Sequence, residues 1–138
     1  MMTKRTLTKL FKGGESYRLE RTVSTTNTDK FCQAICAFSN DLPNCGMPGY
    51  LLVGVKDDGT LAGLKVTDEL LQNIAALRSD GNILPLPLMS VEKFAFAAGD
   101  VLAVEVKPSM FPPVRYRGRV WVRIGPRKDI ASEAEERV

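Results

Sequence analysis

The chain has no histidine, and this absence narrows the chemistry available to its side chains. Without an imidazole neither a Ser-His-Asp nor a Cys-His catalytic group can form, so any catalysis has to rest on carboxylates, lysine or a bound metal ion. Cysteine is also scarce: Cys32, Cys36 and Cys45 are an odd number, and a structural zinc site would usually need four Cys or His ligands. We therefore expect three small buried thiols in a reducing compartment, without a disulfide framework.

Long apolar runs are absent as well. No stretch approaches the length of a membrane span, and the first residues lack the apolar core of a signal peptide, so we expect a cytoplasmic protein with no membrane partner. The 138 residues, 44% hydrophobic and 25% charged, are typical of one soluble domain, which we place over residues 1–138. The net charge of +3 limits any nucleic-acid-binding surface to one patch.

Hydrophobic periodicity predicts helices interspersed with strands and one β-hairpin, which is typical of a mixed α/β (α+β) domain. The expected helices are 3–12, 28–40, 67–79 and 131–138, and the expected strands are 15–23, 50–55, 60–66, 90–97, 100–107 and 119–125. The segment 56–59 carries the Asp-Gly signature of a tight turn between the second and third of these strands. Because the last helix is still under way at Val138, we expect an N-terminal domain covalently linked to a downstream region.

Acidic residues are missing between Pro113 and Asp129, where the basic residues are Arg115, Arg117, Arg119, Arg123, Arg127 and Lys128. Alternation predicts a strand in which Val120, Val122 and Ile124 face the core. Arg119, Trp121 and Arg123 would then share the exposed face. Alternatively, a hairpin spans residues 114–123 and keeps the same alternation.

This row of cations suggests a nucleic-acid partner. Guanidinium groups bind phosphate bidentately, and an exposed indole offers a surface on which a base can stack. The sequence therefore predicts binding of DNA or RNA through the phosphate backbone. The alternative is that acidic side chains from neighbouring strands neutralise the row.

Four segments occur in a characteristic order: GESYRLE, ICAFSND, GYLLVGVKDDGTLAGL and PPVRYRGRVWVRIGPRKDIASEAEE. Together they resemble the Schlafen-type AlbA_2 domain from about Leu7 to the end of the chain. The most specific parts are the Gly54-Val55-x-Asp57-x-Gly59 turn and the Arg123-x-Gly125 strand end.

The resemblance implies a mixed α/β fold, in which helices flank a central mixed sheet that includes the β-hairpin. It also implies a DNA-binding module of a larger ATPase-like, helicase-like or transcription-regulator-like protein. ATP would then be bound only by the downstream region, because Gly13-Gly14 is not part of a phosphate-binding loop.

The same resemblance implies a second function, because some relatives are metal-dependent endoribonucleases with two Glu and one Asp. Those acids map onto Glu15, Glu20 and Asp57, and clustered carboxylates can hold Mg²⁺ or Mn²⁺. Alternatively, Asp57 serves only its turn while the two glutamates pair with neighbouring cations. A third function is assembly, in which the hairpin or an exposed strand edge pairs protomers into a homo-oligomer.

Overall fold

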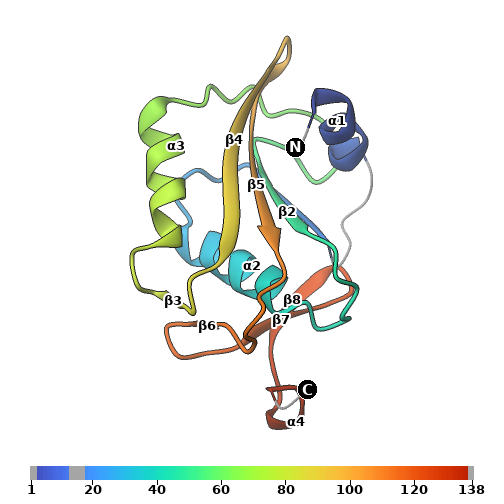
Figure 1. Ribbon diagram of the computed structural model, residues 1–138. Helices are drawn as coiled ribbons and strands as arrows, with labels where there is room; N and C mark the ends of the chain where they lie inside the picture. The colour runs from blue at the N-terminus through green and yellow to red at the C-terminus, as the bar shows by residue number, and fades with distance from the viewer. Residues whose placement is uncertain (1–2, 13–17, 137–138) are drawn as a thin grey trace.

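The computed structural model describes residues 3–12 and 18–136 (Figure 1). Four strands form its main sheet in the order β1-β2-β5-β4. Their bounds are Leu19–Thr22 for β1, Gly49–Val53 for β2, Leu88–Phe96 for β4 and Gly99–Lys107 for β5. β1 runs parallel to β2, and the other two neighbouring pairs are antiparallel. The predicted mixed α/β fold with a central mixed sheet is confirmed.

Helices lie on both faces of this sheet (Figure 1). α2 (Thr28–Asn40) and α3 (Asp68–Ala75) pack on one face, where Leu51 and Val53 of β2 join their core. α1 (Lys4–Lys12) packs on the other face, where Leu7 joins Leu52 of the same strand. Alternate residues of β2 thus reach two separate cores, as expected for a strand covered on both sides.

Capping residues fix the starts of α2 and α3. The Asn27 side chain accepts a hydrogen bond from the Lys30 N–H at 3.1 Å, and the Thr67 hydroxyl accepts one from the Leu70 N–H at 3.1 Å. A short 3₁₀ turn, η1 (Ala76–Arg78), continues α3. The predicted helices 28–40 and 67–79 are therefore confirmed.

The predicted hairpin after β2 is only half correct. Its tight turn forms, because the Lys56 N–H donates to the Thr60 carbonyl at 2.8 Å. The predicted return strand 60–66 is wrong: within the described residues this segment makes a single β-bridge, between Val55 and Leu61. β2 already pairs with β1 on one edge and β5 on the other, so β2 has no free edge for a returning strand.

The arginine-rich segment forms short strands in two small sheets. β6 (Arg115–Tyr116) pairs with β3 (Ile83–Leu84), and β7 (Trp121–Ile124) pairs with β8 (Arg127–Ile130), a strand that was not predicted. The helix predicted over 131–138 shortens to α4 (Glu133–Glu136) within the described residues.

The expected faces of β7 are partly wrong. Val120 and Val122 are buried as predicted, but Ile124 is 49% exposed and Arg123 only 2% exposed. Both faces of the strand are covered, because Val122 packs beside Ala131 whereas Arg123 points to the other side. Alternation alone predicts Arg123 on the exposed face, and that prediction is wrong.

The cysteines are packing residues on and near α2. Cys32 and Cys36 are buried and Cys45 is half-buried. Burial raises the pKa of Cys32 to about 12 and that of Cys36 to about 11, so both stay neutral thiols. Separately, none of the helices in the described ranges has the length and apolar character needed to cross a membrane.

Candidate nucleic-acid interface

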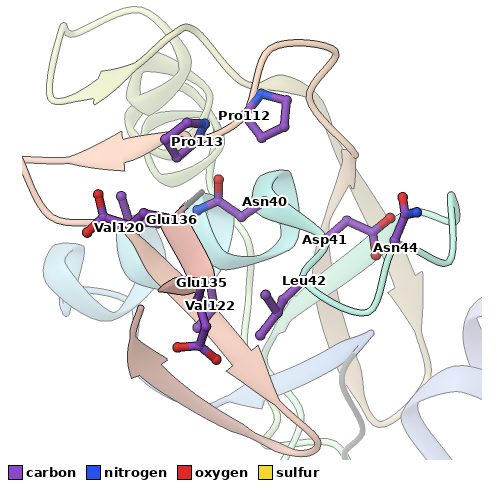
Figure 2. A pocket seen from close by; sticks show the side chains of 10 residues that line it. All are labelled: Asn40, Asp41, Leu42, Asn44, Pro112, Pro113, Val120, Val122, Glu135 and Glu136. Atoms are coloured by element: carbon purple, nitrogen blue, oxygen red, sulfur yellow. The ribbon is translucent and has the colours of Figure 1, made fainter. Parts of the chain in front are cut away.

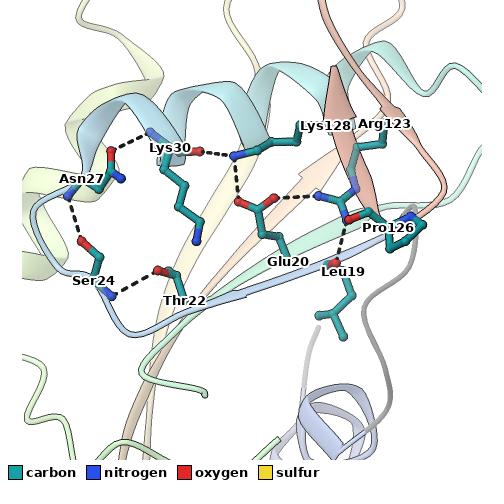
Figure 3. Close-up of polar contacts among 9 residues, drawn as sticks. All are labelled: Leu19, Glu20, Thr22, Ser24, Asn27, Lys30, Arg123, Pro126 and Lys128. Atoms are coloured by element: carbon teal, nitrogen blue, oxygen red, sulfur yellow. Dashed lines mark hydrogen bonds and ion pairs between the residues drawn. The ribbon is translucent and has the colours of Figure 1, made fainter. Parts of the chain in front are cut away.

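A buried ion-pair cluster surrounds Glu20 on β1 (Figure 3). One carboxylate oxygen accepts from Nη1 of Arg123 at 2.7 Å and the other from Nζ of Lys128 at 3.2 Å. The side chains of Glu20 and Arg123 are 7% and 2% exposed. Two cations around one carboxylate offset the cost of removing these charges from water. The cluster therefore ties the β7–β8 hairpin to the edge of the main sheet.

Further contacts hold Arg123 in this place. Its Nη2 donates to the carbonyl oxygens of Leu19 at 3.0 Å and Pro126 at 2.9 Å. The guanidinium carbon lies 5.2 Å from the ring centroid of Phe38 on α2. The Phe38 ring packs directly against the backbone of Gly49, where a Cβ would overlap the ring. Arg123 is thus part of the scaffold beneath the surface.

Lys128 occupies a less enclosed position. Its Nζ also donates to the carbonyl of Lys30, at 3.4 Å, and its side chain is 15% exposed. Burial lowers the pKa of this lysine, and the neighbouring Glu20 carboxylate acts in the opposite direction. The ammonium is therefore anchored to both β1 and α2.

An open groove of about 380 Å³ lies beside the Glu20 cluster, between β1, α2, the 56–59 turn and the β7–β8 hairpin. It is lined by Glu20, Arg21, Lys30, Gln33, Asp57, Trp121, Pro126, Arg127 and Lys128. Four of these residues are cationic and two are acidic, and Glu20 is already engaged by Lys128 and Arg123. A groove of this composition suits a phosphate backbone, with the Trp121 indole in its wall for a base or sugar.

The predicted cations do not form one row. Trp121, Arg127 and Lys128 line the groove, but Arg115, Arg117 and Arg119 lie outside its lining. Arg115 donates to Glu136 at 2.8 Å, and Arg117 lies 3.8 Å from Asp29 while its guanidinium packs 5.4 Å from the Tyr116 ring centroid. Acidic neighbours therefore engage Arg115, Arg117, Arg123 and Lys128. The alternative interpretation expected these acids on neighbouring strands, but only Glu20 lies on a strand, whereas Asp29 and Glu136 belong to helices.

Three residues that line the groove are not among the predicted site residues: Arg21, Lys30 and Gln33. Lys30 and Gln33 are three residues apart and so share one side of α2. This spacing indicates a shared polar side of the helix, but the apolar face of the same helix is the stronger pattern in the sequence. Arg21 belongs to β1, whose residues are all buried.

The three acids mapped by family resemblance are only partly brought together. Glu20 and Asp57 line the same groove, whereas Glu15 lies outside the described residues. Both oxygens of Glu20 already accept hydrogen bonds from cations. Over residues 3–12 and 18–136, no group of three or more His, Cys, Asp or Glu side chains could hold a metal ion. These donors do not fit Mg²⁺ or Mn²⁺, because the metal would have to displace the buried Arg123 and the half-buried Lys128 from Glu20.

A second pocket, of about 190 Å³, lies between the end of α2, β7 and α4 (Figure 2). Its walls include the apolar side chains of Leu42, Val120 and Val122. Glu135 and Glu136 also line it, and carboxylates repel phosphate. The groove beside Glu20 is therefore the better candidate for an interface with a polyanion.

A family model described as Schlafen, AlbA_2 matches residues 15–132 of the chain. No curated protein matches the chain. In solved structures the chain is similar to the N-terminal domain of a Nitrosomonas europaea protein named for its relation to the ATP-dependent DNA helicase RecG. The TM-score is 0.58 at 21% identity, over 78% of this chain and 74% of that one.

The DIP2311 protein from Corynebacterium diphtheriae is also similar, with a TM-score of 0.56 at 18% identity. The match covers 98% of this chain but only 24% of the C. diphtheriae protein. At these identities both similarities concern the fold.

Proposed function

Because the chain belongs to the Schlafen AlbA_2 family, we propose that its groove binds the sugar-phosphate backbone of DNA or RNA. One observation carries the proposal: Arg21, Lys30, Arg127 and Lys128 line a single groove together with the indole of Trp121. Cations suit phosphates, and an aromatic wall accepts any base by stacking. The interface should therefore have little base specificity.

The scaffold under the groove supports the same function. Lys128 and Arg123 are fixed by Glu20, and Arg127 projects from the same hairpin as an exposed side chain. A preorganised hairpin loses little conformational freedom on binding, so more of the electrostatic attraction is retained as affinity. Arg115, Arg117 and Arg119 extend the basic character of the surface outside the groove, and exposed ion pairs such as that of Arg117 are weak enough to exchange for phosphate.

We further infer that this domain, residues 1–138, works within a longer protein. The N. europaea structure is itself an N-terminal domain, and the C. diphtheriae protein is about four times longer than the region matched. A linked downstream region would then carry any helicase-like, ATPase or regulatory activity and bind any ATP, while this domain holds the nucleic acid.

Lys30 and Arg127 line the groove from α2 and from the β7–β8 hairpin. The double variant Lys30→Glu/Arg127→Glu should bind labelled single- and double-stranded oligonucleotides at least about tenfold more weakly at low salt, because two phosphate contacts become repulsive. Fluorescence anisotropy at two salt concentrations measures both the affinity and the salt slope, which should become shallower by about two.

The matched control for this prediction is Arg78→Glu/Lys107→Glu, which reverses two exposed cations at a separate depression beside β4. It should keep most of the affinity. An equal loss in the control, or no binding by the unchanged protein at low ionic strength, would rule the groove out. Light scattering with and without oligonucleotide tests the assembly alternative, which requires a mass above that of the monomer without any ligand.

A metal-dependent endoribonuclease is the second candidate function, favoured by one observation, that Glu20 and Asp57 line the same groove. Because Glu20 is engaged by Arg123 and Lys128, we expect structured RNA to remain intact when incubated with the protein and Mn²⁺. Gel analysis of the RNA measures the outcome. Cleavage that persists in Lys107→Glu but disappears in Asp57→Asn would reverse this expectation and assign catalysis to the groove.

A further inference from the structure

The first helix, α1, has a charge pattern that the groove does not explain. Its nine residues include Lys4, Arg5, Lys9 and Lys12 and no acidic residue. All four cations are exposed, and within residues 3–12 and 18–136 none of them belongs to an ion pair. A helix with only positive charges on its surface is a candidate contact for a polyanion.

The helix holds three of these cations on one side. Arg5, Lys9 and Lys12 follow each other at spacings of four and three residues, which places them in one stripe along the helix. Leu7, on the opposite side, is fully buried and packs with Leu52 and Phe94 of the sheet. The buried leucine fixes the rotation of the helix, so the basic stripe is directed to solvent.

Helix stability accounts for only part of this pattern. Lys9 and Lys12 lie in the last turn, where cations are favourable beside the negative end of the helix dipole. Like charges four residues apart repel each other, and cations in the first turn are unfavourable beside the positive end of the helix dipole. Lys4 and Arg5 occupy that first turn, which contains no acidic residue. A bound polyanion would relieve both unfavourable interactions.

We propose that the basic stripe of α1, Arg5, Lys9 and Lys12, is a second phosphate-binding surface for the same nucleic acid that the groove holds, an inference that rests on the proposed function. A membrane surface is the less suitable partner, because an amphipathic helix binds lipid through an apolar face, and the apolar side of α1 is packed in the core. The cationic side alone remains available.

The location of α1 determines how the two surfaces cooperate. α1 packs with Leu19 on one face of β1, whereas the next residue, Glu20, faces the groove on the other side. Figure 1 shows α1 and α2 on opposite sides of the sheet. A ligand that touches both surfaces must therefore pass around the edge of the sheet, and a short oligonucleotide can occupy only one of them.

The test compares oligonucleotides of about 8 and about 25 nucleotides, a range that brackets one compact binding site. The triple variant Arg5→Gln/Lys9→Gln/Lys12→Gln should bind the long oligonucleotide about 10- to 100-fold more weakly at low salt, with a salt slope shallower by two to three. Its affinity for the short oligonucleotide should be unchanged. Circular dichroism checks that the helix is retained, and Lys65→Gln/Arg78→Gln/Lys107→Gln is the charge-matched control.

The groove variant Lys30→Glu/Arg127→Glu separates this inference from the proposed function. If the triple variant binds the long oligonucleotide as well as the control does while the groove variant is weakened, the role of α1 is overturned and the groove stands. If the unchanged protein binds neither oligonucleotide, both proposals fail. A final measurement tests binding of the protein to vesicles that contain phosphatidylserine. If the triple variant loses vesicle binding but keeps its affinity for oligonucleotides, α1 binds lipid and the inference is overturned.

Discussion

Replacing Glu20 by glutamine should lower the free energy of unfolding by about 3–5 kcal/mol. The substitution keeps the shape of the side chain but leaves Arg123 and Lys128 without the negative charge that both contact. A buried guanidinium deprived of its counter-ion is costly even though the Leu19 and Pro126 carbonyls remain as acceptors. Urea denaturation followed by circular dichroism measures the change.

Two comparisons make this result specific. Glu92→Gln, an exposed site on β4, should change stability by less than about 0.5 kcal/mol. In a double-mutant cycle with Lys128→Met, the effect of Glu20→Gln should be clearly non-additive, because the two side chains form one cluster. An unchanged or higher stability of Glu20→Gln would show that the cluster does not hold the hairpin, and would restore Glu20 as a candidate metal ligand.

The second large effect is expected at Asn40, the last residue of α2. Its Oδ1 accepts from the Val114 N–H at 2.6 Å, and its Nδ2 donates to the carbonyls of Val114 at 3.0 Å and Trp121 at 2.7 Å. Asn40→Ala leaves three backbone groups without this partner, and we expect a loss of about 3 kcal/mol. Nucleic-acid binding should weaken as well, because the variant releases the backbone that carries the Trp121 indole.

Hydrogen exchange provides a local measurement for Asn40. The Val114 amide should exchange faster in Asn40→Ala, whereas Asn73→Ala, an exposed change on α3, should leave both stability and exchange unaltered. Asn40→Asp should be nearly as destabilising as the alanine variant, since a carboxylate placed against two carbonyl oxygens can no longer donate. Full stability of the aspartate variant would show that the two donated bonds do not contribute.

Local periodicity was sufficient for the elements that build the central sheet and its helices. The cap at Asn27 and the shared face of Phe31, Ile35 and Phe38 determine α2, and the alternation of apolar residues in 100–107 determines β5. The absence of a return strand after Gly59 could not be predicted from local periodicity. Whether a strand forms there depends on β1 and β5, which occupy both edges of β2 and come from distant parts of the chain.

The burial of Arg123 is a second feature that the sequence pattern could not predict. Alternation separates two faces of a strand but does not say which of them is covered, and an arginine is normally assigned to solvent. Its partner Glu20 lies 103 residues away in the sequence. Family resemblance had placed Glu20 and Asp57 in one site, and they do line one groove. Only the fold, however, shows that Glu20 is bonded to the very arginine that was expected to bind phosphate.

The burial of the Glu20 cluster has a practical consequence for handling the protein. Mobile ions screen charges at the surface but hardly reach a pair whose side chains are 2% and 7% exposed. Concentrated sodium chloride should therefore strip the protein from a heparin or DNA column without unfolding it. The eluted domain should bind again once the buffer is diluted.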